Sequence, residues 1–141
     1  MKNYIIVSNR NYHPDWLEFS NPEILKNYIN TISPNVEVIF FPFWSWKVSK
    51  EILGKYECIG FHTGTLSGGS PIQNLIRMGE CDADLWMFCM SNKIDEGKGI
   101  DYRKIELYGT LEEILMRESK LIMEMIDGYQ TNSGQPTPTK H

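Results

Sequence analysis

Blocks of apolar residues separated by polar stretches predict a chain of short strands and helices. Five apolar runs have the length of strands, and the first four are apolar enough to be buried. They are residues 4–8, 36–41, 57–61, 85–90 and 100–107. Residues 9–20 and 62–69 are predicted to be loops, and residues 93–99 a tight polar turn.

Helix-start signals precede four segments with apolar residues at helical spacing. The segments are residues 21–32, 49–53, 70–79 and 110–128. Each begins with an Asn, Ser or Thr that can cap the first turn, and in the first and third a proline follows. The last begins with a capping box, and its predicted apolar face runs from Leu111 to Ile126. Gly79 and Gly128 are expected to end the third and fourth helices.

Strands alternate with helices through the first two-thirds of the chain, which predicts an α/β domain with three layers and a mostly parallel sheet. The chain has 141 residues, of which 41% are hydrophobic, enough for one core. We therefore assign residues 1–129 to a single domain. Residues 130–141 are polar and contain proline, so they are expected to form a disordered tail.

The charge pattern excludes some classes of function. Fourteen basic and eighteen acidic residues give a net charge of −4, and these charges are scattered. Non-specific nucleic-acid binding depends on a basic field, so no nucleic-acid partner is expected. The first ten residues are too polar for a signal peptide, and no apolar run is long enough to span a bilayer. A cytoplasmic protein without a membrane partner is predicted.

The three cysteines do not predict a disulfide framework or a metal site. Cys58, Cys81 and Cys89 are odd in number, and their spacing matches no zinc motif. Cys58 and Cys89 fall in strand-like apolar runs, where a cysteine usually serves as a small buried hydrophobe.

Two polar residues follow predicted strands. His62 stands at the end of one strand and Asp95 just beyond the end of another. Because ligands in parallel α/β sheets bind beyond the carboxyl ends of the strands, the two side chains are expected to converge. An imidazole beside a carboxylate is an acid–base unit, and the Gly-rich stretch after His62 offers backbone N–H groups to a developing oxyanion. Taken singly, each also has a structural interpretation, since Asp-Glu-Gly is typical of a turn.

An aromatic loop follows the second predicted strand. Residues 43–46 read Phe-Trp-Ser-Trp, and the two indole rings could form the wall of a site for a flat heterocycle. Tryptophans also serve as core or interface anchors, which leaves a homodimer open.

Four motifs occur in a fixed order around His62. They are Phe-Pro-Phe-Trp-Ser at 41–45, Tyr-Glu-Cys-Ile-Gly-Phe-His at 56–62, Ser-Pro-Ile at 70–72 and Ile-Asp-Glu-Gly at 94–97. In this order they resemble the formyltransferases that use 10-formyltetrahydrofolate. The pattern is most similar to the small enzymes that act on sugar nucleotides, including the pseudaminic-acid pathway group. The resemblance extends from about Val36 to about Ile126.

The resemblance implies a Rossmann-like formyltransferase fold and a formyl transfer to an amino group of a nucleotide-linked amino sugar. It also implies that His62 is the catalytic histidine and that Asp95 is its carboxylate partner. The residues implied to contact the folate donor are Trp44, Ser45, Trp46, Ile94 and Asp95. Those implied to contact the acceptor substrate are Gly68, Gly69 and Ser70.

Three departures from the family pattern leave an alternative open. Gly60 stands where the family usually has an asparagine that donates to the oxyanion. The loop after His62 is shorter than usual, and one strand–helix unit before Val36 is compressed or missing. A catalytically degraded relative that binds a folate, a nucleotide or a protein would carry the same departures. A third interpretation, formylation of an amino acid on tRNA, is opposed by the acidic net charge.

Overall fold

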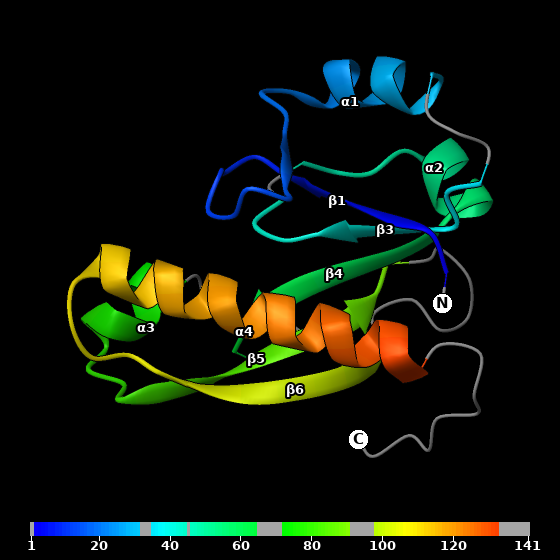
Figure 1. Ribbon diagram of the computed structural model, residues 1–141. Helices are drawn as coiled ribbons and strands as arrows, with labels where there is room; N and C mark the ends of the chain where they lie inside the picture. The colour runs from blue at the N-terminus through cyan, green and yellow to red at the C-terminus, as the bar shows by residue number, and fades with distance from the viewer. Residues whose placement is uncertain (1, 32–34, 45, 65–71, 91–97, 133–141) are drawn as a thin grey trace.

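The computed structural model describes residues 2–31, 35–44, 46–64, 72–90 and 98–132. Within these ranges the chain forms six strands and four α-helices (Figure 1). The strands are β1 (Tyr4–Ser8), β2 (Leu17–Glu18), β3 (Val38–Phe41), β4 (Glu57–Thr63), β5 (Asp82–Cys89) and β6 (Gly99–Glu106). The helices are α1 (Pro22–Ile29), α2 (Lys50–Lys55), α3 (Ile72–Arg77) and α4 (Leu111–Asn132).

The described strands form one sheet in the order β2-β1-β3-β4-β5-β6. Neighbouring strands run parallel from β2 to β4, whereas β5 is antiparallel to both β4 and β6. Three of the five pairings are therefore parallel. The predicted α/β class with a mostly parallel sheet is confirmed, and its antiparallel part is confined to one edge.

Helices cover both faces of this sheet, which confirms the predicted three layers (Figure 1). Successive residues of a strand point to opposite faces, so each central strand contributes to two cores. In β3, Ile39 and Phe41 pack beneath α1 and α2, while Val38 and Phe40 pack on the side of α3 and α4. Burial on both faces explains why these strands are continuous apolar runs in the sequence.

The connection between β1 and β2 is unusually short. A parallel crossover commonly needs a dozen or more residues and usually contains a helix, but here residues 9–16 suffice. Trp16 fills the space beneath α4, where its Nε1 lies 3.1 Å from the sulfur of Met123. The compression expected before Val36 is thus a crossover without its helix. The prediction that residues 9–20 are entirely loop is wrong at β2.

The predicted helix signals are confirmed at most ends. Asn21 and Ser49 cap α1 and α2 through their side-chain oxygens. Thr110 and Glu113 form the reciprocal capping box of α4, with bonds of 2.7 and 3.1 Å. Gly79 follows α3 with a φ of 81°, a left-handed conformation that glycine adopts without strain.

The end predicted for the last helix is wrong. Helix α4 continues past Gly128 to Asn132, because residues after Gly128 pack against the rest of the domain. The side chain of Gln130 is buried and donates from Nε2 to the carbonyl of Lys2 at 2.6 Å. Residues 130–132 therefore belong to a helix and not to the disordered tail predicted for 130–141. Residues 133–141 lie outside the described residues, so the rest of the tail stays a prediction. Among the described helices, including this 22-residue one, none is both long and apolar enough to cross a bilayer.

Several other boundaries differ by a few residues from the predicted ones. Helix α1 already ends at Ile29, and β5 already begins at Asp82. Strand β4 continues to Thr63, so His62 belongs to a strand and not to the following loop. Leu111, assigned to the apolar face of the last helix, is 40% exposed because it opens the first turn.

Candidate active site

His62 is the next-to-last residue of β4, where neighbouring strands fix its position. It pairs with Trp86 of β5, and its imidazole meets the ring of Phe88 edge-on with 6.5 Å between centroids. Side chains alternate along β4, so His62 shares a face with Cys58, which packs beneath α1 and α2. The imidazole is half-buried. It therefore stands at the carboxyl end of the last parallel strand, as predicted.

The predicted convergence of His62 and Asp95 rested on an incorrect assumption about β5. Because β5 is antiparallel, its end at Cys89 lies beside Ile59, well before the carboxyl end of β4. The two strand ends therefore do not meet at one edge of the sheet. Six residues assigned to the site fall outside the described residues: Ser45, Gly68, Gly69, Ser70, Ile94 and Asp95.

Gly60 is a position where a side chain would meet the ring of Phe88. It pairs with Phe88, and a Cβ built there would lie 2.6 Å from Phe88 Cζ and 3.0 Å from Met90 Cγ. Both distances are shorter than ordinary carbon contacts. The ring of Phe88 thus takes the space of the asparagine that the resemblance expects. The glycine leaves room for this ring, and an asparagine here would require the ring of Phe88 to move.

An aromatic row crosses the sheet from His62 to the edge strand. Trp86 lies between His62 and Tyr102 in the register, and the two larger rings are 4.9 Å apart. Neither Trp86 nor Phe88 was assigned to the site from the sequence. The alternation of Trp86, Phe88 and Met90 along one predicted strand could have indicated that they share a face with the histidine.

The aromatic loop after β3 begins with a strained residue. Phe43 has a φ of 53°, a left-handed conformation that costs a non-glycine residue on the order of 1 kcal/mol or more. Its ring packs against Tyr12 and Trp16 with centroid distances of 5.3 and 5.9 Å, which offsets this cost. The turn directs Trp44 towards Phe41 and sets it edge-on to Trp46 at 5.0 Å.

Trp44 has an unused hydrogen-bond donor. Its indole Nε1 is buried and has no acceptor among the residues that the structure describes. A buried donor without an acceptor lowers the folding stability by about 1–3 kcal/mol, so such groups are rare in folded proteins.

An open pocket of about 390 Å³ lies next to this loop. It is formed beyond the carboxyl ends of β1 and β2, under the start of α1, with Trp46 as one wall. Asn9, Glu18 and Ser20 supply its polar groups, and Phe19, Ile24 and Trp46 its apolar surface. Phe19 belongs to the core beneath α1 and α2, so the pocket opens on the same face of the sheet as His62.

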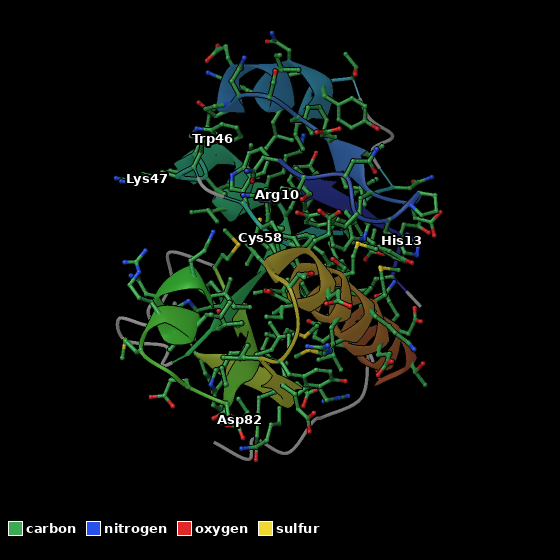
Figure 2. All side chains as sticks on the ribbon, turned by 90° about the vertical axis from the view of Figure 1, so that its left-hand side faces the viewer. Arg10, His13, Trp46, Lys47, Cys58 and Asp82 are labelled. Atoms are coloured by element: carbon green, nitrogen blue, oxygen red, sulfur yellow. The ribbon has the colours of Figure 1, made fainter. Side chains whose placement is uncertain are left out.

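Two cations directly follow lining residues of this pocket in the sequence. Arg10 follows Asn9 and Lys47 follows Trp46, and both side chains are exposed. In Figure 2, which faces the carboxyl ends of β1, β3 and β4, the labels of Arg10, Trp46 and Lys47 lie together above that of Cys58. Asp82 lies at the opposite end of the molecule in this view. The pocket lining is thus acidic and the flanking residues are basic.

The cysteines have no catalytic geometry. Cys58 is 1% exposed, and burial raises the pKa of its thiol to about 12, so its reactive thiolate is not populated near neutral pH. Cys58, Cys81 and Cys89 are all free thiols. No cluster of three or more His, Cys, Asp or Glu within the described ranges could hold a metal ion.

Comparisons with known proteins agree with the fold and with the motif order. No protein-family model matches the chain, and no curated protein sequence matches it. Among solved structures, a methionyl-tRNA formyltransferase from Clostridium thermocellum is 32% identical with a TM-score of 0.75. The match covers 99% of this chain and 68% of that protein.

More distant structures share the fold at lower identity. HypX from Aquifex aeolicus, solved in complex with tetrahydrofolic acid, is 17% identical with a TM-score of 0.59, and the match covers 99% of this chain and 28% of HypX. A sugar N-formyltransferase from a Shewanella species is 13% identical with a TM-score of 0.60, over 94% of this chain and 69% of that enzyme. The 32% identity, over 99% of this chain and 68% of that relative, and the shared fold lead to one conclusion: the chain belongs to the formyltransferase family.

Proposed function

We propose that this protein transfers a formyl group from 10-formyltetrahydrofolate to the amino group of a nucleotide-linked amino sugar. The observation that carries the proposal is the position of His62 within a formyltransferase fold. The imidazole stands at the carboxyl end of β4, on the face that also carries the aromatic loop and the pocket. A sugar N-formyltransferase among the similar structures supports the acceptor class.

The aromatic loop is suited to hold the folate donor. The half-buried indole ring of Trp44 offers a flat apolar surface for a pterin. The edge-on Trp46 stiffens the loop around it. HypX, which shares the fold, binds tetrahydrofolic acid. When bound, 10-formyltetrahydrofolate supplies an electrophilic formyl carbon attached to N10.

The proposed role of His62 is to move one proton. A C–N bond forms between the acceptor amine and the formyl carbon, and the bond from that carbon to N10 breaks. One proton leaves the amine and one is gained by N10, so atoms and charge balance. Neutral His62 accepts the first proton and returns it to the leaving nitrogen, which is the usual work of a general acid–base histidine.

The proposed partner of His62 must be able to reach it. The amide of Cys89 donates to the carbonyl of Lys98 at 3.0 Å. Lys98 therefore lies beside the end of β5. Asp95 precedes Lys98 by three residues, a stretch of about 10 Å at most. Trp86, which pairs with His62, lies about 10 Å from Cys89 along β5. The length of this segment therefore permits contact between the two side chains.

The packing at Gly60 supports a weaker alternative. An asparagine amide at this position would donate to the developing oxyanion, and the loss of one such donor costs about 3 kcal/mol in the transition state. This position carries no amide, and the ring of Phe88 occupies the space beside Gly60. Either another group stabilises the oxyanion, or the protein has lost catalysis and binds a folate, a nucleotide or a protein partner.

A second candidate acceptor is an amino acid carried by tRNA. The Clostridium thermocellum relative is a methionyl-tRNA formyltransferase by name, and its 32% identity exceeds the 13% of the sugar enzyme. Nucleic-acid binding rests largely on basic residues that contact phosphates. The net charge of −4 and the scattered charges of this chain count against tRNA.

The test is release of tetrahydrofolate from 10-formyltetrahydrofolate with a panel of amino-sugar nucleotides and with methionyl-tRNA. His62→Ala and Asp95→Asn should abolish release, whereas His13→Ala, the same change at a half-buried loop histidine that does not line the pocket, should not. Release with an amino-sugar nucleotide that depends on His62 supports the proposal. Release only with methionyl-tRNA would favour the second candidate acceptor instead of the amino sugar. Folate binding without turnover for any amine would identify a degraded relative.

A further inference from the structure

We propose that the pocket between Glu18 and Trp46 binds the nucleoside of the acceptor and that Arg10 and Lys47 at its rim hold the diphosphate. This inference rests on the proposed function, because it names how the acceptor is held. The pocket is separate from His62 but opens on the same face of the sheet. The two places therefore suit the two ends of one elongated substrate.

The pocket lining matches a nucleoside in shape and in hydrogen-bonding capacity. The flat wall formed by Trp46 suits stacking of a planar base, an interaction that any base can make. Glu18 is an acceptor when ionised, and Ser20 and Asn9 can donate or accept. These groups complement base N–H donors and ribose hydroxyls. Glu18 would repel a phosphate placed inside the pocket itself.

The residues that follow the lining supply positive charge, which the lining residues lack. Arg10 and Lys47 directly follow the lining residues Asn9 and Trp46, and both side chains are exposed on the side of the molecule that Figure 2 shows. Arg10 is held only lightly, by a 3.4 Å contact from Nη1 to the hydroxyl of Tyr12. A guanidinium and an ammonium together can neutralise a diphosphate at the mouth while the base lies inside.

The distance between the pocket and His62 favours the acceptor over the folate donor as the ligand of the pocket. In the order β2-β1-β3-β4, two strand spacings separate β1 from β4, which is about 10 Å. In the donor only one methylene lies between N10 and the pterin ring, so the pterin must bind close to His62. In a nucleotide-linked sugar a diphosphate and the sugar ring lie between nucleoside and amine. The pocket therefore suits the acceptor, and Trp46 serves it instead of the folate contact that the resemblance implies.

The test is binding of nucleoside diphosphates in the absence of folate and of any amine. Calorimetric titration of the full chain with the uridine, thymidine, guanosine and adenosine diphosphates should identify at least one that binds. Glu18→Gln and Trp46→Ala should each weaken its binding about tenfold or more, and Arg10→Ala and Lys47→Ala should reduce its salt dependence. The matched controls Glu23→Gln and Lys26→Ala change α1 residues that do not line the pocket, and they should leave the affinity unchanged.

Each outcome decides the proposal independently of catalysis. Loss of nucleotide affinity in the pocket variants, with the controls unchanged, supports it. It is overturned if no nucleoside diphosphate binds, if the pocket variants bind normally, or if 5-formyltetrahydrofolate competes for the pocket. A protein that releases tetrahydrofolate but fails this test would keep the proposed formyl transfer and lose only the assignment of the pocket.

Discussion

Glu118 on α4 should make the stability of this protein depend on pH. Its side chain is 6% exposed and lies on the buried face of the helix. No hydrogen bond or ion pair to its carboxyl group occurs within the described part of the chain. Burial therefore raises the pKa of this carboxyl from 4.5 to about 7, because the charged form is poorly solvated.

The sign and size of the effect follow from this pKa. Below about pH 4.5 the carboxyl is neutral in both the folded and the unfolded chain, and its burial carries no ionisation penalty. As the pH rises, the unfolded chain ionises first, so stability is lost until the folded pKa of about 7 has been passed. At about 1.36 kcal/mol per pKa unit, the total loss is about 3 kcal/mol.

Urea unfolding at about pH 5 and about pH 8 measures this difference. Glu118→Gln removes the ionisation, so the variant should be more stable than the parent at the higher pH, by up to about 3 kcal/mol. Near pH 5 the two should differ by less than about 1 kcal/mol. Glu124→Gln, an exposed position on the same helix, should change neither value by more than about 0.5 kcal/mol. A Glu118→Gln variant that is no more stable than the parent at about pH 8 would refute the reasoning.

Three further predictions concern packing, reactivity and capping. Gly60→Ala should cost about 1–3 kcal/mol in urea unfolding because its Cβ meets the Phe88 ring, and adding Phe88→Ala should remove that specific penalty in a double-mutant cycle; additive effects would contradict the clash. Mass spectrometry after alkylation near neutral pH should find Cys81 modified and Cys58 protected until the protein unfolds; equal rates would show that burial does not protect it. Thr110→Ala should lower the free energy of unfolding by about 0.5–2 kcal/mol, and an unchanged midpoint would argue against the capping box.

The region around Gly60 illustrates why sequence and structure give different accounts of the site. In the sequence, the glycine is a missing catalytic amide. In the structure, the ring of Phe88 packs directly against this glycine and also meets His62 edge-on. The pairing of β4 with β5 brings these residues together across 28 positions of sequence, from Gly60 to Phe88. No local pattern specifies such a pairing.

The sequence by itself determined most of the elements and the family. Caps at Asn21, Ser49 and Thr110, and the continuous apolar run of β3, are local signals whose partners lie within a few residues. Their hydrogen bonds and burial depend little on the rest of the chain. The motif order around His62 is also a property of the sequence, and it was sufficient to indicate the formyltransferase fold.

Only the tertiary structure decided the direction of β5, the contact between Phe88 and Gly60, and the pocket beside Trp46. It also extended α4 beyond Gly128, because distant contacts outweighed a residue that favours helix ends. Strand direction and register are settled by which arrangement buries the most apolar surface and pairs the most backbone groups. These are sums over residues far apart in the chain, and a single sequence does not display them.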